Sequence, residues 1–283
     1  MAVGIGNIQL LGENRKMTLK VQSFTWVAKV PIIRKSILKC FNKLNIRESI
    51  FQVESIHFKK NKVFLQKDNY FECKADGFMQ NSMVYMENYN NSIIINDRAE
   101  LYSVNIRVLG ENNQIIIGKE CVLRNSDILI KGNHNKIIIG NNVSAYNATF
   151  HLGQDKNEVR IGNGTTLHGR DYHSVHFELY ESSKIVVGTD CMFSNGIQIR
   201  PSDAHSIVDL KGNRLNPARD IIIGDHCWIG FGVIILKGTH IQNNTVVGAG
   251  SLCTKKYSES YCVLAGNPAR VVKQQIDWNR KFL

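Results

Sequence analysis

A repeated triplet that begins and ends with isoleucine or valine constrains the fold of this chain more than any other feature. Its copies end at Ile95, Ile117, Ile139, Ile161, Val187 and Ile223. A glycine follows every copy except the first, and a small or β-branched residue such as Cys121 stands four positions after each copy. Successive copies are 22, 22, 22, 26 and 36 residues apart. Because recurrence of this kind marks stacked structural units, the sequence predicts a β-solenoid.

Beyond the last triplet the spacing of interior candidates tightens to six residues. These positions are Ile229, Ile235, Ile241, Val247 and Cys253. Six residues for each of three faces give a coil of 18, and the same face of the next coil lies about 4.8 Å away. The apolar side chains then form continuous interior ladders, while the longer periods place insertions at the corners. The sequence therefore predicts an all-β domain, a parallel β-helix over residues 51–273.

Residues 223–273 resemble the hexapeptide-repeat acyltransferases. The segments that carry the resemblance are IGDHCWIGFGVIILKGTHIQNNTVVGAGSLCTK and, after it, AGNPARVVK. The resemblance implies that the β-helix is left-handed, which periodicity cannot show because parallel crossovers are nearly always right-handed. It also implies a homotrimer with its sites between neighbouring subunits.

The two ends of the chain depart from the repeat. Residues 1–50 form a basic, partly helical region, and we expect irregular early coils from there to about residue 90. A basic amphipathic helix is predicted over residues 27–47. It would cap the β-helix, pack on a neighbouring subunit or lie on an anionic membrane surface. Its apolar face consists of Ile33, Ile37, Phe41 and Leu44. Residues 274–283 form a C-terminal tail.

The net charge and the cysteine content limit which binding partners and which cell compartment we expect. The chain carries 35 Lys and Arg against 24 Asp and Glu, a formal charge of +11, which favours polyanions or phosphate-bearing cofactors. Seven cysteines without a CxxC pair argue against a disulfide framework or a structural zinc site, and they fit small interior positions in a reducing cytoplasm. No apolar run is long enough to span a bilayer, so we expect a cytoplasmic protein, with any contact at the inner membrane surface being peripheral.

The longest interruption of the repeat, at about residues 190–220, sets His205 among polar residues. Loops on a rigid scaffold commonly carry binding and chemistry. The pattern SDAHSI…GNRLN…DIIIGDHCWIG resembles the bacterial capsule and surface-polysaccharide O-acetyltransferases, which implies that His205 is the general base for acetyl transfer from acetyl-CoA to a sugar hydroxyl. The candidate acceptor contacts in and beside this insertion are Arg200, Ser202, Asp203, Arg214 and Asn216. Arginine suits a carboxylate-bearing sugar, and Asp203 is also a candidate to orient His205.

Trp228 follows interior Cys227 directly, so on a strand it should point outward. The resemblance places it in the channel for acetyl-CoA, whereas burial at a subunit interface is the alternative interpretation. The other candidate coenzyme contacts are Gly230, Gly248, Ser251, Lys255, Lys256 and Arg270. Glycines admit a thin pantetheine arm, and the remaining residues suit phosphates.

Other functions remain open at this point. A nucleotide-sugar N-acetyltransferase is the nearest alternative, although the first 50 residues show no βαβ pattern. A zinc hydratase would draw on His151, His168, His173 and His176, whose spacing does not match coil-to-coil placement. A non-catalytic polysaccharide-binding β-helix is the third alternative. We expect the partner to be a saccharide acceptor and not a nucleic acid. We also expect the acyltransferase to need no metal.

Overall fold

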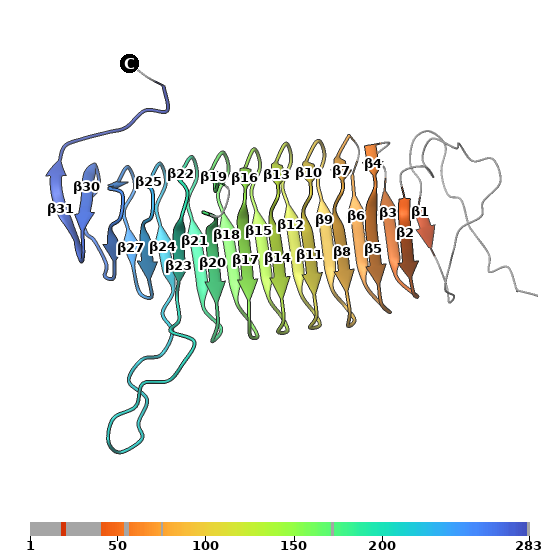
Figure 1. The fold of residues 1–283 in the computed structure, drawn as a ribbon, viewed down its shortest axis with the longest axis horizontal. Coiled ribbons are helices and arrows are strands. Elements are labelled where there is room, and N and C mark those ends of the chain that lie inside the picture. Colours follow the sequence, from red (N-terminus) through yellow and green to blue (C-terminus); the bar gives the residue numbers. More distant parts are fainter. Residues whose placement is uncertain (1–17, 21–40, 54–56, 75, 171–172, 282–283) are drawn as a thin grey trace, which may run out of the picture.

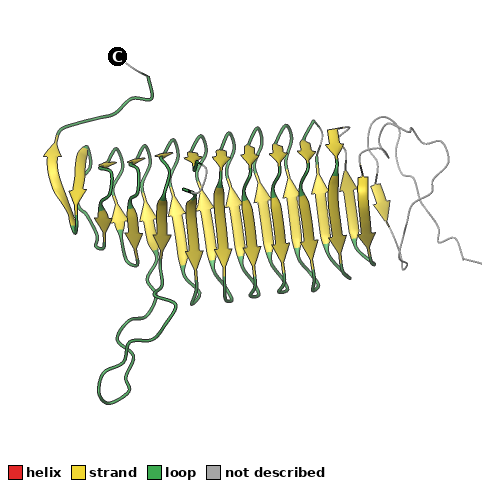
Figure 2. Ribbon diagram, viewed as in Figure 1, coloured by secondary structure: helices red, strands yellow, loops and turns green. Residues whose placement is uncertain are grey.

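A computed structural model describes residues 18–20, 41–53, 57–74, 76–170 and 173–281 as a three-sided β-solenoid (Figure 1). Each coil contributes one strand to each of three sheets, and the strands stack in parallel along the long axis. The described residues contain no helix, and hence none long and apolar enough to cross a membrane (Figure 2). The predicted fold class, a left-handed parallel β-helix, is confirmed.

The sheet that contains the repeated triplets is called the triplet sheet. Its strands are β1 (Thr18–Lys20), β3 (Ile50–Val53), β6 (Tyr70–Cys73), β9 (Ser92–Ile95), β12 (Gln114–Ile117), β15 (Lys136–Ile139), β18 (Glu158–Ile161), β21 (Lys184–Val187), β24 (Ile221–Ile223) and β27 (His240–Ile241). All pairs in it are parallel except β1 with β3.

The second sheet, here the tryptophan sheet, carries Trp228. Its strands are β4 (His57–Lys59), β7 (Phe78–Gln80), β10 (Glu100–Tyr102), β13 (Val122–Arg124), β16 (Ser144–Tyr146), β19 (Thr166–His168), β22 (Met192–Phe193), β25 (Trp228–Ile229), β28 (Val246–Val247), β30 (Cys262–Gly266) and β31 (Ala269–Gln274). The final strand, β31, pairs antiparallel with β30 and ends the stack.

The third sheet, here the arm sheet, leads into the long insertion. Its strands are β2 (Phe41–Ile46), β5 (Asn61–Leu65), β8 (Met83–Met86), β11 (Asn105–Val108), β14 (Asp127–Ile130), β17 (Ala148–Leu152), β20 (Val175–Leu179), β23 (Ile197–Arg200), β26 (Ile234–Leu236) and β29 (Leu252–Cys253). The insertion leaves the solenoid after β23 and returns at β24.

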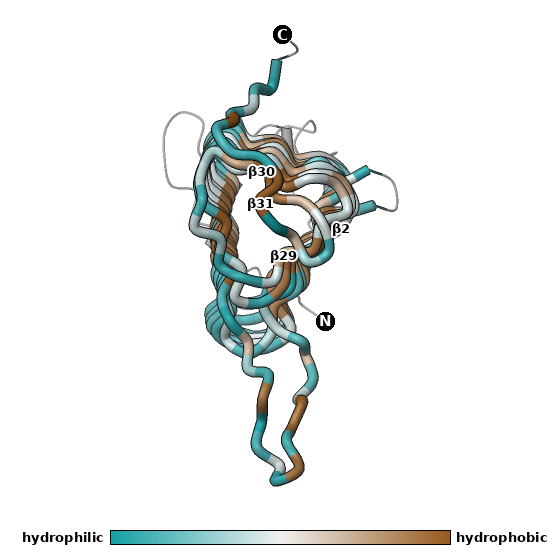
Figure 3. Tube along the Cα trace, turned by 90° about the vertical axis from the view of Figure 1, so that its left-hand side faces the viewer, coloured by the Kyte–Doolittle hydropathy of each residue, from teal (hydrophilic) through white to brown (hydrophobic). Residues whose placement is uncertain are grey.

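The interior follows the predicted ladders. The first and last members of each triplet are buried, and the positions four residues on, such as Cys121 and Cys227, have no exposed surface. In Figure 3 the brown, apolar positions recur along the stacked strands of the solenoid. One corner also holds a ladder of buried asparagines, in which the Asn113 side-chain oxygen accepts the backbone N–H of Asn135 at 2.8 Å. Polar groups at this corner are therefore satisfied from coil to coil.

Two expectations for the early part of the chain were wrong. Residues 50–53, 57–74 and 76–86 form regular coils, because the large buried side chains of Phe51, Phe58 and Phe71 fill the interior that isoleucines fill later. The helix predicted over residues 27–47 is also contradicted where it can be checked, since Phe41–Ile46 form strand β2 beside β5. Pairing with a neighbouring strand overrides a local helical spacing. Residues 21–40 lie outside the described residues.

Candidate active site

The insertion, here called the arm (residues 201–220), projects from the corner between the arm sheet and the triplet sheet (Figure 1). Its base is closed by the Arg219 N–H, which donates to the Pro201 carbonyl at 2.9 Å. Farther out it is a hairpin, with Val208 bridged to Arg214. Asp209 accepts two backbone N–H groups across the turn at the tip, at 2.8 and 2.9 Å. The arm is therefore internally hydrogen-bonded although it extends from the solenoid.

His205 lies near the base of the arm with an exposed side chain. Its backbone is held by Asn216, whose amide donates to the His205 carbonyl at 2.8 Å. The same amide donates to Asp203 at 2.7 Å, and its oxygen accepts the Ile207 N–H at 2.6 Å. Asn216 is 7% exposed. It thus fixes the backbone at His205 and Ile207, holds the Asp203 side chain, and leaves His205 exposed to solvent.

Three other polar residues of the arm bind the solenoid: Ser202, Asp203 and Arg214. The Ser202 hydroxyl and the Arg214 guanidinium both bind Glu181, Arg214 at 2.6 Å. The hydrogen bond from Ser202, followed by that from Arg214, lowers the pKa of Glu181 despite partial burial. Asp203 binds Lys237 as well as Asn216, and these two hydrogen bonds lower the pKa of its carboxyl. The structure therefore pairs Asp203 with Lys237 and Asn216, whereas the sequence suggested His205 as its partner.

Arg200 ends strand β23 directly before the arm. Its guanidinium binds Glu178 at 2.7 Å, and Glu178 also lies 3.8 Å from His151 and 3.6 Å from His176. Burial lowers the pKa of both imidazoles, which favours their neutral forms. The cluster of Arg200, Glu178, His151 and His176 lies on the outer face of the arm sheet, and Arg200 is the residue directly before the arm.

The histidines considered for a zinc site do not converge. His168 lies on the tryptophan sheet and stacks on Tyr146 at 4.8 Å, away from His151 and His176 on the arm sheet. No group of three potential ligands occurs among the described residues. The placement gives no support to a zinc hydratase.

Trp228 points outward from β25, as expected, and 40% of it is exposed. Gly230 and Gly248 follow strands of the same sheet. A Cβ on Gly230 would lie 2.7 Å from the Val247 carbonyl oxygen, and one on Gly248 would lie 3.2 Å from the Ala265 Cβ. Gly230 is therefore required by the close approach of the next coil, and a side chain at Gly248 would press on Ala265, which are different reasons from room for a coenzyme arm.

The candidate phosphate contacts divide into two groups. Lys255, Lys256 and Arg270 are exposed near the C-terminal end of the solenoid. Ser251 is 1% exposed and its hydroxyl donates to the Gly248 carbonyl at 2.6 Å. Its hydroxyl faces inward and serves the coil, so the three basic residues are the ones that can meet a phosphate.

The two halves of the candidate site lie on different sides of one chain. The arm leaves the corner between the arm sheet and the triplet sheet, which is the corner opposite the tryptophan sheet. Figure 3 shows the arm at one end of the section and strands β30 and β31 at the other. Between them lies the filled core. His205 and Trp228 of the same chain are therefore not brought together.

Several residues around the site escaped the sequence analysis. Glu178, Glu181 and Lys237 hold Arg200 and the arm, yet they are separated in sequence from their partners by 21 residues or more. These residues could be identified from the sequence only by aligning each coil with the next, and such an alignment requires exact strand boundaries. The C-terminal tail, which packs Trp278 beside Trp228, offered no repeat at all.

Comparisons with known proteins relate the C-terminal coils to bacterial acetyltransferases. Residues 220–255 match the family model for bacterial transferase hexapeptide repeats. The polysialic acid O-acetyltransferase of Neisseria meningitidis is 36% identical over 103 residues, and that of Escherichia coli O1:K1 is 36% identical over 101 residues. The matched segments cover 36% and 35% of this chain, but only 48% and 33% of these curated relatives.

Solved structures extend the similarity over most of the chain. The polysialic acid O-acetyltransferase OatWY superposes with a TM-score of 0.65 at 34% identity, covering 76% of this chain and 92% of that one. The polySia-specific acetyltransferase NeuO gives 0.61 at 28% identity, covering 78% and 90%. The similarity thus includes the solenoid as well as the matched repeats.

Proposed function

Because this chain belongs to the hexapeptide-repeat acyltransferase family, we propose that it transfers acetyl from acetyl-CoA to a hydroxyl of an acidic bacterial capsule polysaccharide. The similarity to OatWY, 34% identity over 92% of that chain, is the observation that carries the proposal. The charge of +11 supports an acidic acceptor, because excess cations concentrate a polyanion at the surface.

In this proposal the imidazole of His205 removes the proton of the sugar hydroxyl as that oxygen attacks the thioester carbonyl. A side chain that faces solvent on a hydrogen-bonded backbone suits such a base, since the substrate must reach it while its position stays fixed. The acetyl group passes directly to the sugar oxygen as the carbon–sulfur bond breaks, and the leaving thiolate of coenzyme A takes up the proton that His205 removed.

The donor would lie along the C-terminal coils. Trp228 offers an exposed aromatic face on the tryptophan sheet, and Lys255, Lys256 and Arg270 offer positive charge for phosphates. These residues fit a long anionic molecule that places its thioester end beside a tryptophan. Gly230, Gly248 and Ser251 contribute by letting the coils stack closely.

The acceptor would approach along the arm sheet. Arg200 stands at the foot of the arm, where Glu178 holds its guanidinium, and it remains 47% exposed at the side chain. A carboxylate of the acceptor could bind the remaining donors of this group. Ser202, Asp203, Arg214 and Asn216 act mainly by holding the arm in place.

We propose a homotrimer in which the arm of one subunit reaches the tryptophan sheet of its neighbour. The arm carries four apolar side chains that are more than half exposed: Ile207, Val208, Leu210 and Leu215. An ordered hairpin with such a surface favours a protein partner. A second copy is the partner that would also supply Trp228 to His205.

The test is His205→Ala with acetyl-CoA and a panel of acidic and neutral oligosaccharides. Mass spectrometry of wild-type reactions should show a gain of one acetyl group on an acidic member. Loss of a general base typically lowers turnover by about a hundred- to ten-thousand-fold. The exposed side chain supports no ladder, so the melting temperature should stay within about 2 °C of wild type.

Ser206→Ala, next to His205 on the same exposed segment, is the matched control and should keep near-wild-type turnover. A wild-type protein that acetylates no oligosaccharide would contradict the function. If it acetylates one but His205→Ala retains more than about a tenth of the turnover, the function stands and the base lies elsewhere.

A further inference from the structure

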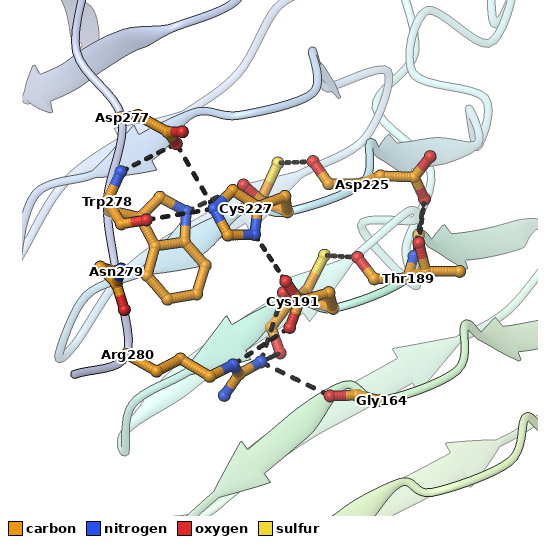
Figure 4. A network of polar contacts seen from close by, with 12 residues as sticks. Gly164, Thr189, Cys191, Asp225, Cys227, Asp277, Trp278, Asn279 and Arg280 are labelled. Carbon is orange, nitrogen blue, oxygen red and sulfur yellow. Dashed lines mark hydrogen bonds and ion pairs between the residues drawn. The ribbon is translucent and has the colours of Figure 1, made fainter.

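The C-terminal strap, residues 276–280, runs across the outer side of the tryptophan sheet (Figure 4). It follows strand β31, and its first backbone N–H, on Ile276, donates to the Tyr261 carbonyl at 3.0 Å. From there its side chains contact three successive coils, those of β25, β22 and β19. Because this short segment contacts three coils, it is part of the folded surface of the solenoid.

Trp278 is the central anchor of the strap. Only 8% of it is exposed, and its ring stacks on His226 with centroids 4.3 Å apart and planes within 12°. The indole N–H donates to the His226 carbonyl at 2.9 Å. Both the apolar body and the polar edge of this tryptophan are thus satisfied by the solenoid.

His226 is held at both ring nitrogens. Nδ1 lies 2.6 Å from a carboxylate oxygen of Asp190, and Nε2 lies 3.2 Å from the Trp278 carbonyl oxygen. Asp277 lies 3.4 Å from Nε2. Both ring nitrogens thus lie against oxygen atoms of the protein. His226 therefore serves as an attachment point for the strap.

Arg280 fixes the far end of the strap. Its Nε donates to Asp190 at 3.1 Å, Nη1 to the Thr166 hydroxyl at 3.0 Å, and Nη2 to the Cys191 carbonyl at 2.9 Å. Figure 4 shows this guanidinium turned toward the coils. With its donors directed at the solenoid, Arg280 contributes attachment and shape, and the phosphate contacts fall to other basic residues.

The strap meets the proposed donor site at Trp228. The rings of Trp228 and Trp278 lie 6.1 Å apart at 47°, a tilted aromatic contact. The register neighbours of Trp228 on its own sheet are Met192 and Val246, which are smaller or more flexible than an indole ring. Trp278 is thus the rigid group beside Trp228, and it leaves 40% of Trp228 exposed.

We infer that the strap is a fixed wall of the acetyl-CoA site, in which Trp278 is a positioning residue that sets the orientation of Trp228. This inference rests on the proposed function for the identity of the ligand. It differs from a lid because the strap is attached to three coils while Trp228 stays accessible beside it. The strap therefore shapes the site before the donor arrives.

The test compares Trp278→Ala and Arg280→Ala with wild type in acetyl-CoA binding and in steady-state kinetics. Loss of an aromatic contact of this kind corresponds to roughly a three- to tenfold change in affinity. We expect the Kd and KM for acetyl-CoA to rise by that factor, while kcat and the acceptor KM stay within about twofold. Trp278→Phe, which keeps the ring stacking, should restore most of the affinity.

The matched control is Asn279→Ala, because the Asn279 oxygen accepts the Lys281 N–H within the tail itself. It should leave the donor KM unchanged. A higher kcat or a lower donor KM in Trp278→Ala would overturn the inference and show a covering strap. An unchanged Kd for acetyl-CoA in a folded Trp278→Ala protein would also overturn the inference, because Trp278 would then serve only to pack the strap on the solenoid.

Calorimetric titration without acceptor separates this inference from the proposed function. If wild type binds acetyl-CoA but acetylates no saccharide, the proposed acceptor fails and the strap is still tested by the binding of the variants. If wild type does not bind acetyl-CoA, both the function and the wall are refuted together.

Discussion

Replacing Asn216 with alanine should loosen the arm around His205 without unfolding the protein. The substitution removes two hydrogen bonds donated to Asp203 and the His205 carbonyl, and one accepted from the Ile207 N–H. Each such bond contributes about 0.5–1.5 kcal/mol, so the fixed arm conformation loses roughly 2–4 kcal/mol. Since about 1.4 kcal/mol is a factor of ten in population, we expect kcat to fall by about tenfold or more.

Steady-state kinetics with saturating acetyl-CoA measure this loss. The donor KM should stay constant, and the melting temperature should fall by less than about 2 °C, because the arm lies outside the stacked coils. Asn213→Ala is the matched control, since its amide binds only Asp209 at the tip, at 2.9 Å. A normal kcat with a raised acceptor KM would refute this reasoning and make Asn216 an acceptor contact.

Three further predictions concern the ladders and the arm surface. Val233→Asp buries an unpaired carboxylate at a fully buried position, costing several kcal/mol, and should lower the melting temperature by 10 °C or more in calorimetry, whereas Ile234→Asp on the outer face should not. Burial raises the pKa of the Cys121 and Cys253 thiols to about 11, so below pH 9 they stay neutral and iodoacetamide should label them slowly until urea unfolds the chain; rapid native labelling would contradict the interior ladder. Leu210→Asp should reduce the oligomer mass in light scattering and leave the fold intact, since this residue is fully exposed in one chain.

The sequence predicted the coils well wherever one residue type repeats at one position. Triplets and hexads place interior side chains directly, because an inward position in a solenoid accepts little besides apolar or small residues. The early coils were included in the predicted β-helix, but their regularity was not recognised because Phe51 and Phe71 occupy the interior positions with a different shape. Strand β2 was missed because Phe41 and Leu44 fit a helical spacing as well as a strand, and only the neighbour β5 decides between them.

The site was less predictable than the coils. His205 was found through its family pattern, and the outward direction of Trp228 followed from the interior position of Cys227. The partners of the arm, Glu181 and Lys237, depend on three-dimensional neighbours that no short pattern encodes. The strap depends on a chain reversal after β31, so the hydrogen bonds of Trp278 with His226 and of Arg280 with Asp190 join residues 52 and 90 positions apart.

The position of the arm leads to a test of the proposed subunit arrangement. Because the insertion lies at a corner, strands on both sides keep their register, as in β23 with β26 and β21 with β24. The core is therefore continuous, and it separates the arm from the tryptophan sheet of the same chain. A working site with both His205 and Trp228 then requires two subunits.

Mixing His205→Ala and Trp228→Ala subunits by unfolding and refolding them together should accordingly restore activity that neither variant has alone. In a randomly mixed trimer, a site is intact when its arm comes from the Trp228→Ala chain and its tryptophan sheet from the other, which is about one site in four. We expect turnover near a quarter of the wild-type value after co-refolding, and only the mean of the two parents when the separately folded proteins are combined without exchange. Co-refolded protein that stays at the parental mean would show that the two residues do not act across a subunit boundary, because every mixed trimer would otherwise contain intact sites.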